Sequence, residues 1–304
     1  MRVRPEQLVL PAFIAESVLA GGNAVGVRFS NRELDPLWGA GLRFALAALL
    51  LGCVMAVLRL PFPRGRALAG AIVFGVLMFG GSFGLAYYAF VRIHAGLGQT
   101  LFALVPLATL LLAVAQKQER LRAAAVAGTL LSLVGVGLIS GLSESESVPL
   151  LSLLAILGGV FCFAQASVLV RRFPPVHSVT LNAIGMATGA LVLIALALAF
   201  DHSIVVPEQA ETWLALAYLV VIGSGVVFVL YVFVIRVWGA SRAAYGFVLT
   251  PVVTVLLSAW LDDEPISRGL VFGGVLVLAG VYIGALRPAS RPAPGPAVVE
   301  ESTF

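Results

Sequence analysis

The sequence predicts an all-α integral membrane protein with ten transmembrane helices, built as two inverted five-helix repeats. Three observations predict this fold: the composition, the length of the apolar runs and the repetition of one pattern in both halves. Of the 304 residues, 60% are hydrophobic and only 11% are charged, whereas soluble domains carry about 25% charged residues. The mean hydropathy is +1.04. The sequence is therefore that of a membrane protein.

The apolar runs have the length and continuity of spanning helices. A transmembrane helix needs about 20 mostly apolar residues, and the strands of a membrane barrel would alternate apolar with polar residues. The polar breaks between the runs are short, so all spans are expected to pack as one bundle. The expected spans are residues 8–28, 37–58, 67–91, 95–115, 121–141, 149–171, 176–200, 212–236, 240–261 and 267–286.

The two halves of the chain repeat one another. An offset of about 145 residues pairs Pro106 with Pro251 and Glu119 with Glu264, and such residues are costly inside or beside membrane helices. Each half contains five expected spans. Because five is odd, the second half must enter the membrane from the opposite side, which is a common design of secondary transporters. The same offset pairs Ala95 with Ala240, Phe102 with Phe247, Thr109 with Thr254, Gly128 with Gly273 and Gly135 with Gly280.

Several segments resemble a known family. The stretches "LAYYAFVRIHAGLGQTLFALVPLATLLLAVAQKQERL" and "FVIRVWGASRAAYGFVLTPVVTVLLSAWLDDEPIS", with the glycine-rich runs after each, resemble the C-terminal parts of paired EamA-type domains in the drug/metabolite transporter superfamily. "GGNAVGVRFS" and "LDPLWGAGLRFALAALLLG" resemble the opening of the first domain. The resemblance implies a ten-helix exporter of small metabolites or toxic organic compounds in the cell inner membrane, driven by a gradient or by exchange.

The domain boundaries follow from the repeat. We expect a first EamA-like repeat over residues 1–142, a linker over 143–148 that contains "SESES", and a second repeat over 149–286. The proline-rich tail, residues 287–304, is expected to be disordered in the cytoplasm. With both termini on the cytoplasmic side of the plasma membrane, 14 of the 19 lysines and arginines lie on that side, as the positive-inside rule requires.

Two ionisable residues within expected spans are the first candidates for a substrate site, because such groups are expensive in a bilayer. Glu16 lies near the middle of the first span and Arg43 in the outer third of the second. They could pair with each other as a structural ion pair that fixes packing. Alternatively, Glu16 binds a proton or a cationic group of the substrate, and Arg43 binds a carboxylate. Apolar surroundings favour the neutral form of a carboxyl group.

Other polar residues extend the candidate site. Asn23 follows Glu16 by seven residues and shares its helix face. The expected topology places two polar layers around an apolar middle, as a cavity opened alternately from each side would need. The outer layer is Asn23, Arg43 and Gln99, and the inner layer is Gln165, Asn182 and Tyr245.

Pro106 and Pro251 fall near the middle of the fourth and ninth spans. A proline removes one helical hydrogen bond and kinks a helix. We expect matching kinks on which the helices rock during transport, with a purely structural kink as the alternative.

The remaining classes of function are disfavoured. An intramembrane enzyme would show a nucleophile with a base, or clustered metal ligands, whereas His94, His177 and His202 are scattered. We expect no enzyme activity, no cofactor, no metal and no nucleic-acid partner. The expected partners are a small-molecule substrate and the lipid bilayer, with a coupling proton and a homodimer left open. The alternative to a transporter is a channel or a non-transporting membrane scaffold.

Overall fold

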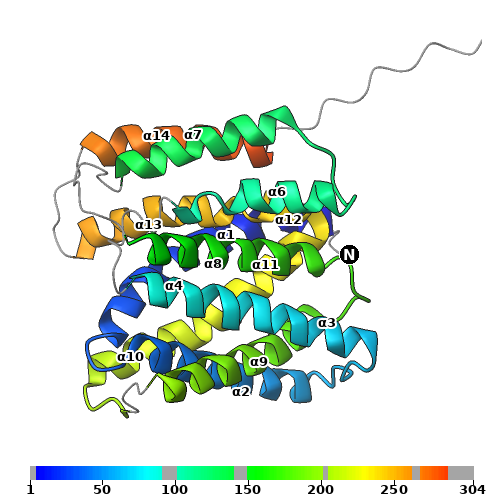
Figure 1. Ribbon diagram of the computed structural model, residues 1–304, viewed down its shortest axis with the longest axis vertical. Helices are drawn as coiled ribbons and strands as arrows, with labels where there is room; N and C mark the ends of the chain where they lie inside the picture. The colour runs from blue at the N-terminus through cyan, green and yellow to red at the C-terminus, as the bar shows by residue number, and fades with distance from the viewer. Residues whose placement is uncertain (1–4, 91–100, 140–148, 201–204, 262–267, 287–304) are drawn as a thin grey trace, which may run out of the picture.

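The computed structural model describes residues 5–90, 101–139, 149–200, 205–261 and 268–286. Within these ranges all regular structure is helical, and each of the ten expected spans corresponds to helical residues (Figure 1). Six helical stretches are long and apolar enough to cross a membrane, and three shorter apolar helices accompany them. The all-α membrane architecture predicted from the sequence is confirmed.

The elements follow the order of the two repeats. The first half contains α1 (Pro5–Ser30), α2 (Pro36–Val57), α3 (Arg66–Gly75), η1 (Val76–Gly81), α4 (Ser82–Phe90), α6 (Val105–Ala115) and α7 (Ala123–Ile139). The second half contains α8 (Leu150–Leu169), α9 (Ser178–Ala199), α10 (Ala210–Tyr218), η2 (Leu219–Val226), α11 (Val227–Trp238), α12 (Ala240–Ala243), α13 (Gly246–Leu261), α14 (Arg268–Val281) and η3 (Tyr282–Leu286).

The third span of each repeat contains a turn of π-helix. In the first repeat η1 joins α3 to α4, and in the second η2 joins α10 to α11. The offset of about 145 residues places η1 onto η2. π-Helical turns are rare and frequently occur at functional sites. This shared irregularity marks the middle of both spans as a place to look for a site.

The packing of the helices has the symmetry of an inverted repeat. The second spans of the two halves, α2 and α9, pack on each other, and so do the fifth spans, α7 and α14. Figure 1 shows these two pairs at opposite ends of the molecule. The remaining contacts also occur in matched sets: α1 packs on α13 as α6 packs on α8, and α1 packs on α11 as α4 packs on α8.

Glycines at equivalent positions of the two repeats also show this two-fold relation. A Cβ atom added to Gly128 would lie 2.6 Å from the carbonyl oxygen of Gly280, and one added to Gly135 would lie 2.6 Å from that of Gly273. Gly128 corresponds to Gly273 and Gly135 to Gly280 in the sequence repeat. Each contact is therefore the image of the other, which is the property of a contact across a two-fold axis. The absence of side chains lets α7 and α14 approach backbone to backbone.

The fourth and ninth spans are interrupted before Pro106 and Pro251, and not at these prolines, where the sequence predicted kinks. Pro106 is near the start of α6, directly after a turn at residues 103–104. This position suits proline, because the first residues of a helix need no partner for their N–H groups. The ninth span is interrupted at residues 244–245, between α12 and α13, and Pro251 lies within α13.

The loop after α1 holds the start of α10. Arg32 forms an ion pair with Glu211, with 3.2 Å between Nη1 and Oε2. The Glu33 carboxylate accepts hydrogen bonds from the backbone N–H groups of Glu208 and Gln209 at 3.2–3.3 Å. A residue of the first repeat thus caps a helix of the second, which satisfies donors that the helix leaves open.

We expect Glu33→Gln to lower the melting temperature of the detergent-solubilised protein at neutral pH. The Thr212 hydroxyl and the backbone amides of Gln209 and Glu208 lower the pKa of the Glu33 carboxyl. A lowered folded-state pKa stabilises the protein above the unfolded value of about 4.3, and this contribution is lost as the pH falls through the folded pKa. The difference between wild type and variant should therefore shrink at acid pH. Glu208→Gln is the control, and an equal effect in both variants would contradict the capping role.

Candidate functional site

Arg43 forms the centre of a polar cluster inside the bundle. Its side chain is only 2% exposed and reaches from α2 to the π-helical turn η2. Its Nε donates to Ser224 Oγ at 2.8 Å, and its Nη2 donates to the carbonyl oxygen of Gly223 at 3.0 Å. Nη2 also donates to Asn23 Oδ1 at 3.4 Å. Three elements, α1, α2 and η2, thus position one guanidinium.

Gly223 makes this arrangement sterically possible. A Cβ atom at Gly223 would lie 1.9 Å from Asn23 Oδ1 and 3.2 Å from Arg43 Nη2, so no other residue fits there without moving the cluster. Its carbonyl oxygen accepts from Asn23 Nδ2 at 3.3 Å as well as from Arg43. The π-turn of η2 thus presents a glycine carbonyl and the Ser224 hydroxyl on one side of the helix.

Three aromatic residues also lie near Arg43. The guanidinium carbon lies 5.2 Å from the centre of the Phe44 ring. Tyr87 and Tyr218 lie close enough for electrostatic interaction with the charge, and the Tyr218 hydroxyl donates to the Leu19 carbonyl oxygen at 2.7 Å. Within the described residues, no carboxylate forms an ion pair with Arg43. A buried guanidinium with neutral partners and aromatic walls is suited to bind an anionic group.

Glu16 forms a second polar centre, on α1, the helix that also carries Asn23. Its side chain is 1% exposed, and its Oε2 has no hydrogen-bond partner among the described residues. Its Oε1 faces α13, where a Cβ atom at Gly246 would lie 2.3 Å away. It also lies within electrostatic reach of Tyr231 on α11. A buried polar atom without a partner is costly, so this carboxyl is a candidate for binding a proton or a cation.

The two centres are separate, and the ion pair considered from the sequence does not form. Glu16 faces α13 and α11, whereas Arg43 faces η2 and Asn23. Asn23 follows Glu16 by seven residues, which corresponds to about 10 Å along a helix. Sequence spacing could not reveal this separation, because the direction of Arg43 depends on how α2 packs against the second repeat.

The other candidates from the sequence lie in separate places. Gln165 accepts from Gln116 Nε2 at 2.9 Å. Asn182 donates to the carbonyl oxygens of Ser178 and Phe228, and its own Oδ1 is buried with no hydrogen-bond partner among the described residues. Gln99 lies outside the described residues. Asn23 and Arg43 are joined by a hydrogen bond. Gln165 and Asn182, the two inner candidates above, instead bond to different neighbours.

Tyr245 lies between the last helix pair and the rest of the bundle. Its hydroxyl is 2.8 Å from Thr129 Oγ1 and donates to the Ala125 carbonyl oxygen at 2.6 Å. A Cβ atom at Gly284 would lie 2.1 Å from this hydroxyl. Tyr245 therefore fixes α7 and η3 to the break between α12 and α13.

A further set of polar contacts joins the repeats near the ends of α6, α8 and α11. The Glu119 carboxylate accepts from the Ser241 N–H at 3.3 Å and from the Ser241 hydroxyl. Gln118 Nε2 donates to the Val168 carbonyl oxygen at 3.2 Å, and Arg172 Nη1 donates to Gln116 Oε1 at 3.4 Å. These contacts hold the two halves together on the side opposite to the Arg32–Glu211 pair. The sequence repeat singled out Glu119 but not its partner.

Sequence reasoning missed Ser224, Gly223 and Tyr218. The stretch "IGSGV", residues 222–226, could have indicated Gly223 and Ser224, because it places a serine between two glycines inside a long apolar run. Among the described residues, no group of three or more His, Cys, Asp or Glu side chains could hold a metal ion.

The fold is that of a multi-pass helical membrane protein, and comparison with known proteins shows its family. The sequence matches the EamA-like transporter family over residues 8–141 and 150–285, so the chain belongs to that family and contains two such domains. The chain is 27% identical to the uncharacterized inner membrane transporter YedA of Escherichia coli K12, over 96% of this chain and 97% of the relative. It is therefore an inner membrane protein, and the family is not one of enzymes.

Other relatives agree with this assignment. The chain is 28% identical to a probable terminal-alkyne amino-acid exporter of Streptantibioticus cattleyicolor, over 85% of this chain and 90% of the relative. A solved crystal structure of another protein is 21% identical and superposes with a TM-score of 0.76, over 92% of this chain and 97% of its own. That similarity concerns the fold alone.

Proposed function

We propose that the protein is a secondary exporter of small metabolites that carry a carboxylate, such as amino acids, and that it works by alternating access between its two inverted repeats. The observation that carries the proposal is the buried Arg43, which has neutral hydrogen-bond partners from both repeats. A charge at such depth is expensive and is typical of a substrate pathway. The amino-acid exporter among the relatives supports the same class of substrate.

In this proposal the substrate carboxylate binds Arg43. The guanidinium offers five N–H donors, and Ser224 and Asn23 orient it. Tyr87 and Tyr218 provide aromatic surface for the organic part of the substrate. Closing either side of the protein removes water, which strengthens the attraction between the guanidinium and the carboxylate.

Glu16 is proposed to carry a coupling proton. Asn23, which contacts Arg43, lies about 10 Å from Glu16 along α1. The carboxylate and ammonium groups of an α-amino acid are only a few bonds apart, so we expect these two groups of one molecule not to reach both Arg43 and Glu16. Glu16 is therefore free to exchange a proton while the substrate occupies Arg43. Since the lone Oε2 atom lies at the contact of α1 with α13 and α11, protonation would alter the packing between the repeats.

The polar contacts of Glu119, Gln116 and Gln118 are proposed to form the gate on the cytoplasmic side. They join the loop after α6 to α8 and α12. Each is a partly buried hydrogen bond between uncharged or singly charged polar groups, and the net free energy of such a bond is small when water can replace it as the halves separate. The opposite opening would require them to separate, as alternating access demands.

Glu16→Gln is expected to abolish transport driven by a pH gradient while leaving substrate binding measurable. The neutral amide cannot exchange a proton, so the imposed gradient no longer changes flux. The measurement is efflux or uptake in proteoliposomes, with and without a pH gradient, using a panel of amino acids and organic cations read by mass spectrometry. Glu6→Gln removes an exposed carboxylate from the same helix and serves as the control.

Each outcome of this assay separates the alternatives. Unchanged pH dependence in Glu16→Gln would exclude the coupling role. Exchange of preloaded substrate without any response to a gradient would indicate an exchanger with a structural Glu16. A channel would conduct down a gradient without saturation, and a scaffold would move no compound from the panel.

A further inference from the structure

Tyr231 and Ser167 form a hydrogen-bonded pair inside the bundle. Tyr231 lies on α11 and Ser167 on α8, and both side chains are fully buried. Their hydroxyl oxygens are 2.8 Å apart. The Tyr231 ring packs against those of Phe163 and Phe247, with centroid distances of 5.6 and 5.2 Å. These aromatic contacts restrict the direction in which the Tyr231 hydroxyl points.

The hydrogen bonds of Ser167 decide which of the two hydroxyl groups is the donor. A serine has one O–H hydrogen, and Ser167 donates it to the carbonyl oxygen of Phe163, one helical turn earlier, at 2.9 Å. In its contact with Tyr231, the Ser167 oxygen therefore accepts. The single hydrogen of Tyr231 points to Ser167, and the Tyr231 oxygen still has lone pairs that can accept a further hydrogen bond.

Glu16 lies beside Tyr231 because α1 runs antiparallel to the third span of the second repeat. At one end of this contact, the rings of Phe13 and Trp238 are 5.5 Å apart, and at the other end Asn23 donates to a carbonyl oxygen of η2. Glu16 lies between these two contacts along α1, and Tyr231 lies between them along η2 and α11. The carboxyl group of Glu16 is within electrostatic reach of the Tyr231 hydroxyl.

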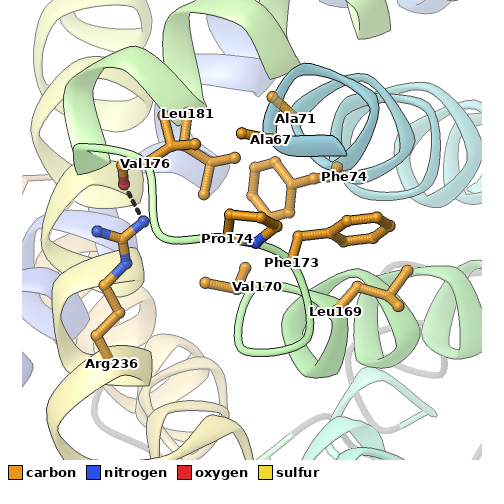
Figure 2. A pocket seen from close by; sticks show the side chains of 11 residues that line it. Ala67, Ala71, Phe74, Leu169, Val170, Phe173, Pro174, Val176, Leu181 and Arg236 are labelled. Carbon is orange, nitrogen blue, oxygen red and sulfur yellow. Dashed lines mark hydrogen bonds between the residues drawn. The ribbon is translucent and has the colours of Figure 1, made fainter. Parts of the chain in front are cut away.

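The other ionisable groups near α1 have partners elsewhere. The helices that pack most closely on α1 are α10, η2, α11 and α13, and neither η2 nor α13 contains an ionisable residue. On α10, Glu211 forms the ion pair of the outer loop, and Tyr218 donates to a backbone carbonyl of α1. On α11, Arg236 donates to a backbone carbonyl oxygen beside a small, mostly apolar pocket (Figure 2). The other charged residues of α1 lie at least ten positions from Glu16 and are Glu6 and Arg28.

We propose that the Tyr231 oxygen accepts a hydrogen bond from Glu16 when Glu16 is protonated, and that Ser167 sets this preference by holding the hydrogen of Tyr231. This inference rests on the proposed role of Glu16 as the carrier of the coupling proton. A carboxylate and a tyrosine oxygen without a hydrogen between them are both acceptors and do not bond. A proton turns the carboxyl group into a donor, and the unpartnered Oε2 atom then gains the partner that a buried polar atom needs.

This bond joins the two repeats only in the protonated state. α1 belongs to the first repeat, whereas α8 and α11 belong to the second. Proton binding holds α1 against α11, and proton release frees it. Ser167 extends the connection to α8, the helix that also forms the contacts of Gln116 and Gln118 in the proposed cytoplasmic gate.

The test is an infrared titration of the purified full-length protein in detergent. The carbonyl band of a protonated carboxyl group reports its hydrogen bonding, and subtracting the spectrum of Glu16→Gln assigns the band of Glu16. In Ser167→Ala the hydrogen of Tyr231 is released and can be donated to the Glu16 carboxylate, which favours the charged form. We expect the midpoint at which the band disappears with rising pH to fall by about one pH unit, the effect of one hydrogen bond to a carboxylate. Ser152→Ala removes another buried serine hydroxyl from α8 and should leave the midpoint unchanged.

Tyr231→Phe gives a second, independent result. It keeps the ring but removes the acceptor, so the band of protonated Glu16 should move to the higher frequency of a carboxyl group without a hydrogen bond. In the Tyr231→Phe background, Ser167→Ala should cause no further shift of the midpoint, because no tyrosine hydrogen is left to release. An unchanged midpoint in folded Ser167→Ala, or an unchanged band in folded Tyr231→Phe, would overturn the proposal. So would a subtraction that shows no carboxyl band of Glu16 at any pH.

Flux in proteoliposomes distinguishes this inference from the proposed function. If Glu16→Gln responds to a pH gradient as the wild type does while both infrared changes occur, Glu16 exchanges a proton with Tyr231 as its partner but does not couple transport, and only the proposed function fails. If Glu16→Gln loses gradient-driven flux and neither infrared change occurs, coupling by Glu16 is retained and Tyr231 is not its partner.

Discussion

Gly128→Val is expected to destabilise the folded protein strongly. A Cβ atom at this position would lie 2.6 Å from the Gly280 carbonyl oxygen and 2.8 Å from the Gly284 Cα. Both are backbone atoms, so no side chain can rotate away and α7 must separate from α14. Overpacking of a well-packed interior costs about 1–3 kcal/mol, and the rigid backbone contact places this substitution at about the upper end of that range. The measurement is the yield and melting temperature of monodisperse protein in detergent.

A second variant at the repeat-related contact and a control variant at an open position complete this test. Gly135→Val disturbs the symmetry-related contact with Gly273 and should destabilise the protein to a similar extent. Gly52→Val makes the same change where an added Cβ atom meets nothing within 4 Å, and it should fold normally. If Gly128→Val and Gly52→Val behaved alike, the close backbone contact of α7 with α14 would be refuted.

Arg43→Gln is expected to abolish transport of carboxylate substrates while the protein remains folded. Glutamine retains a donor for Ser224 or the Gly223 carbonyl but removes the charge. Losing one partner of a buried charge pair costs about 2–5 kcal/mol, so the apparent affinity should fall by about 30-fold or more. The measurement is substrate-induced thermal stabilisation together with efflux from proteoliposomes.

Two further variants distinguish the charge of Arg43 from the geometry of its N–H donors. Arg43→Lys keeps the charge but loses the fixed fork of donors, so it should retain part of the binding. Arg32→Gln removes an exposed arginine of the outer loop and should leave transport unchanged. Normal transport by folded Arg43→Gln would show that the guanidinium has only a structural role, and the proposed substrate site would then have to be abandoned.

The sequence predicted the class of fold because its signals are local and strong. A bilayer requires long apolar helices, and ten such runs are legible in the chain. Prolines and glutamates are rare enough in membrane helices that their recurrence after about 145 residues revealed the repeat. The odd number of spans in each half then required an inverted arrangement, and the matched contacts of Gly128 with Gly280 and Gly135 with Gly273 agree with it.

The candidate site was predicted only in part. Glu16, Asn23 and Arg43 stood out from the sequence because they are costly in a membrane, and the structure brings Asn23 and Arg43 together. Ser224 and Gly223 did not stand out, because a serine and a glycine are common in transmembrane helices. Their role depends on η2, a π-turn that turns a carbonyl and a hydroxyl toward α2.

By itself, then, the sequence determined the membrane class, the ten spans and their duplication. It also identified the polar residues Glu16, Asn23 and Arg43, whose burial in a bilayer costs free energy. Tertiary structure decided which of those residues meet. It separated Glu16 from Arg43, joined Arg43 to Ser224 about 180 residues later in the chain, and joined Ser167 to Tyr231. The physical reason is that hydropathy acts on each helix separately, whereas the direction of a side chain depends on how the helices of the two repeats pack.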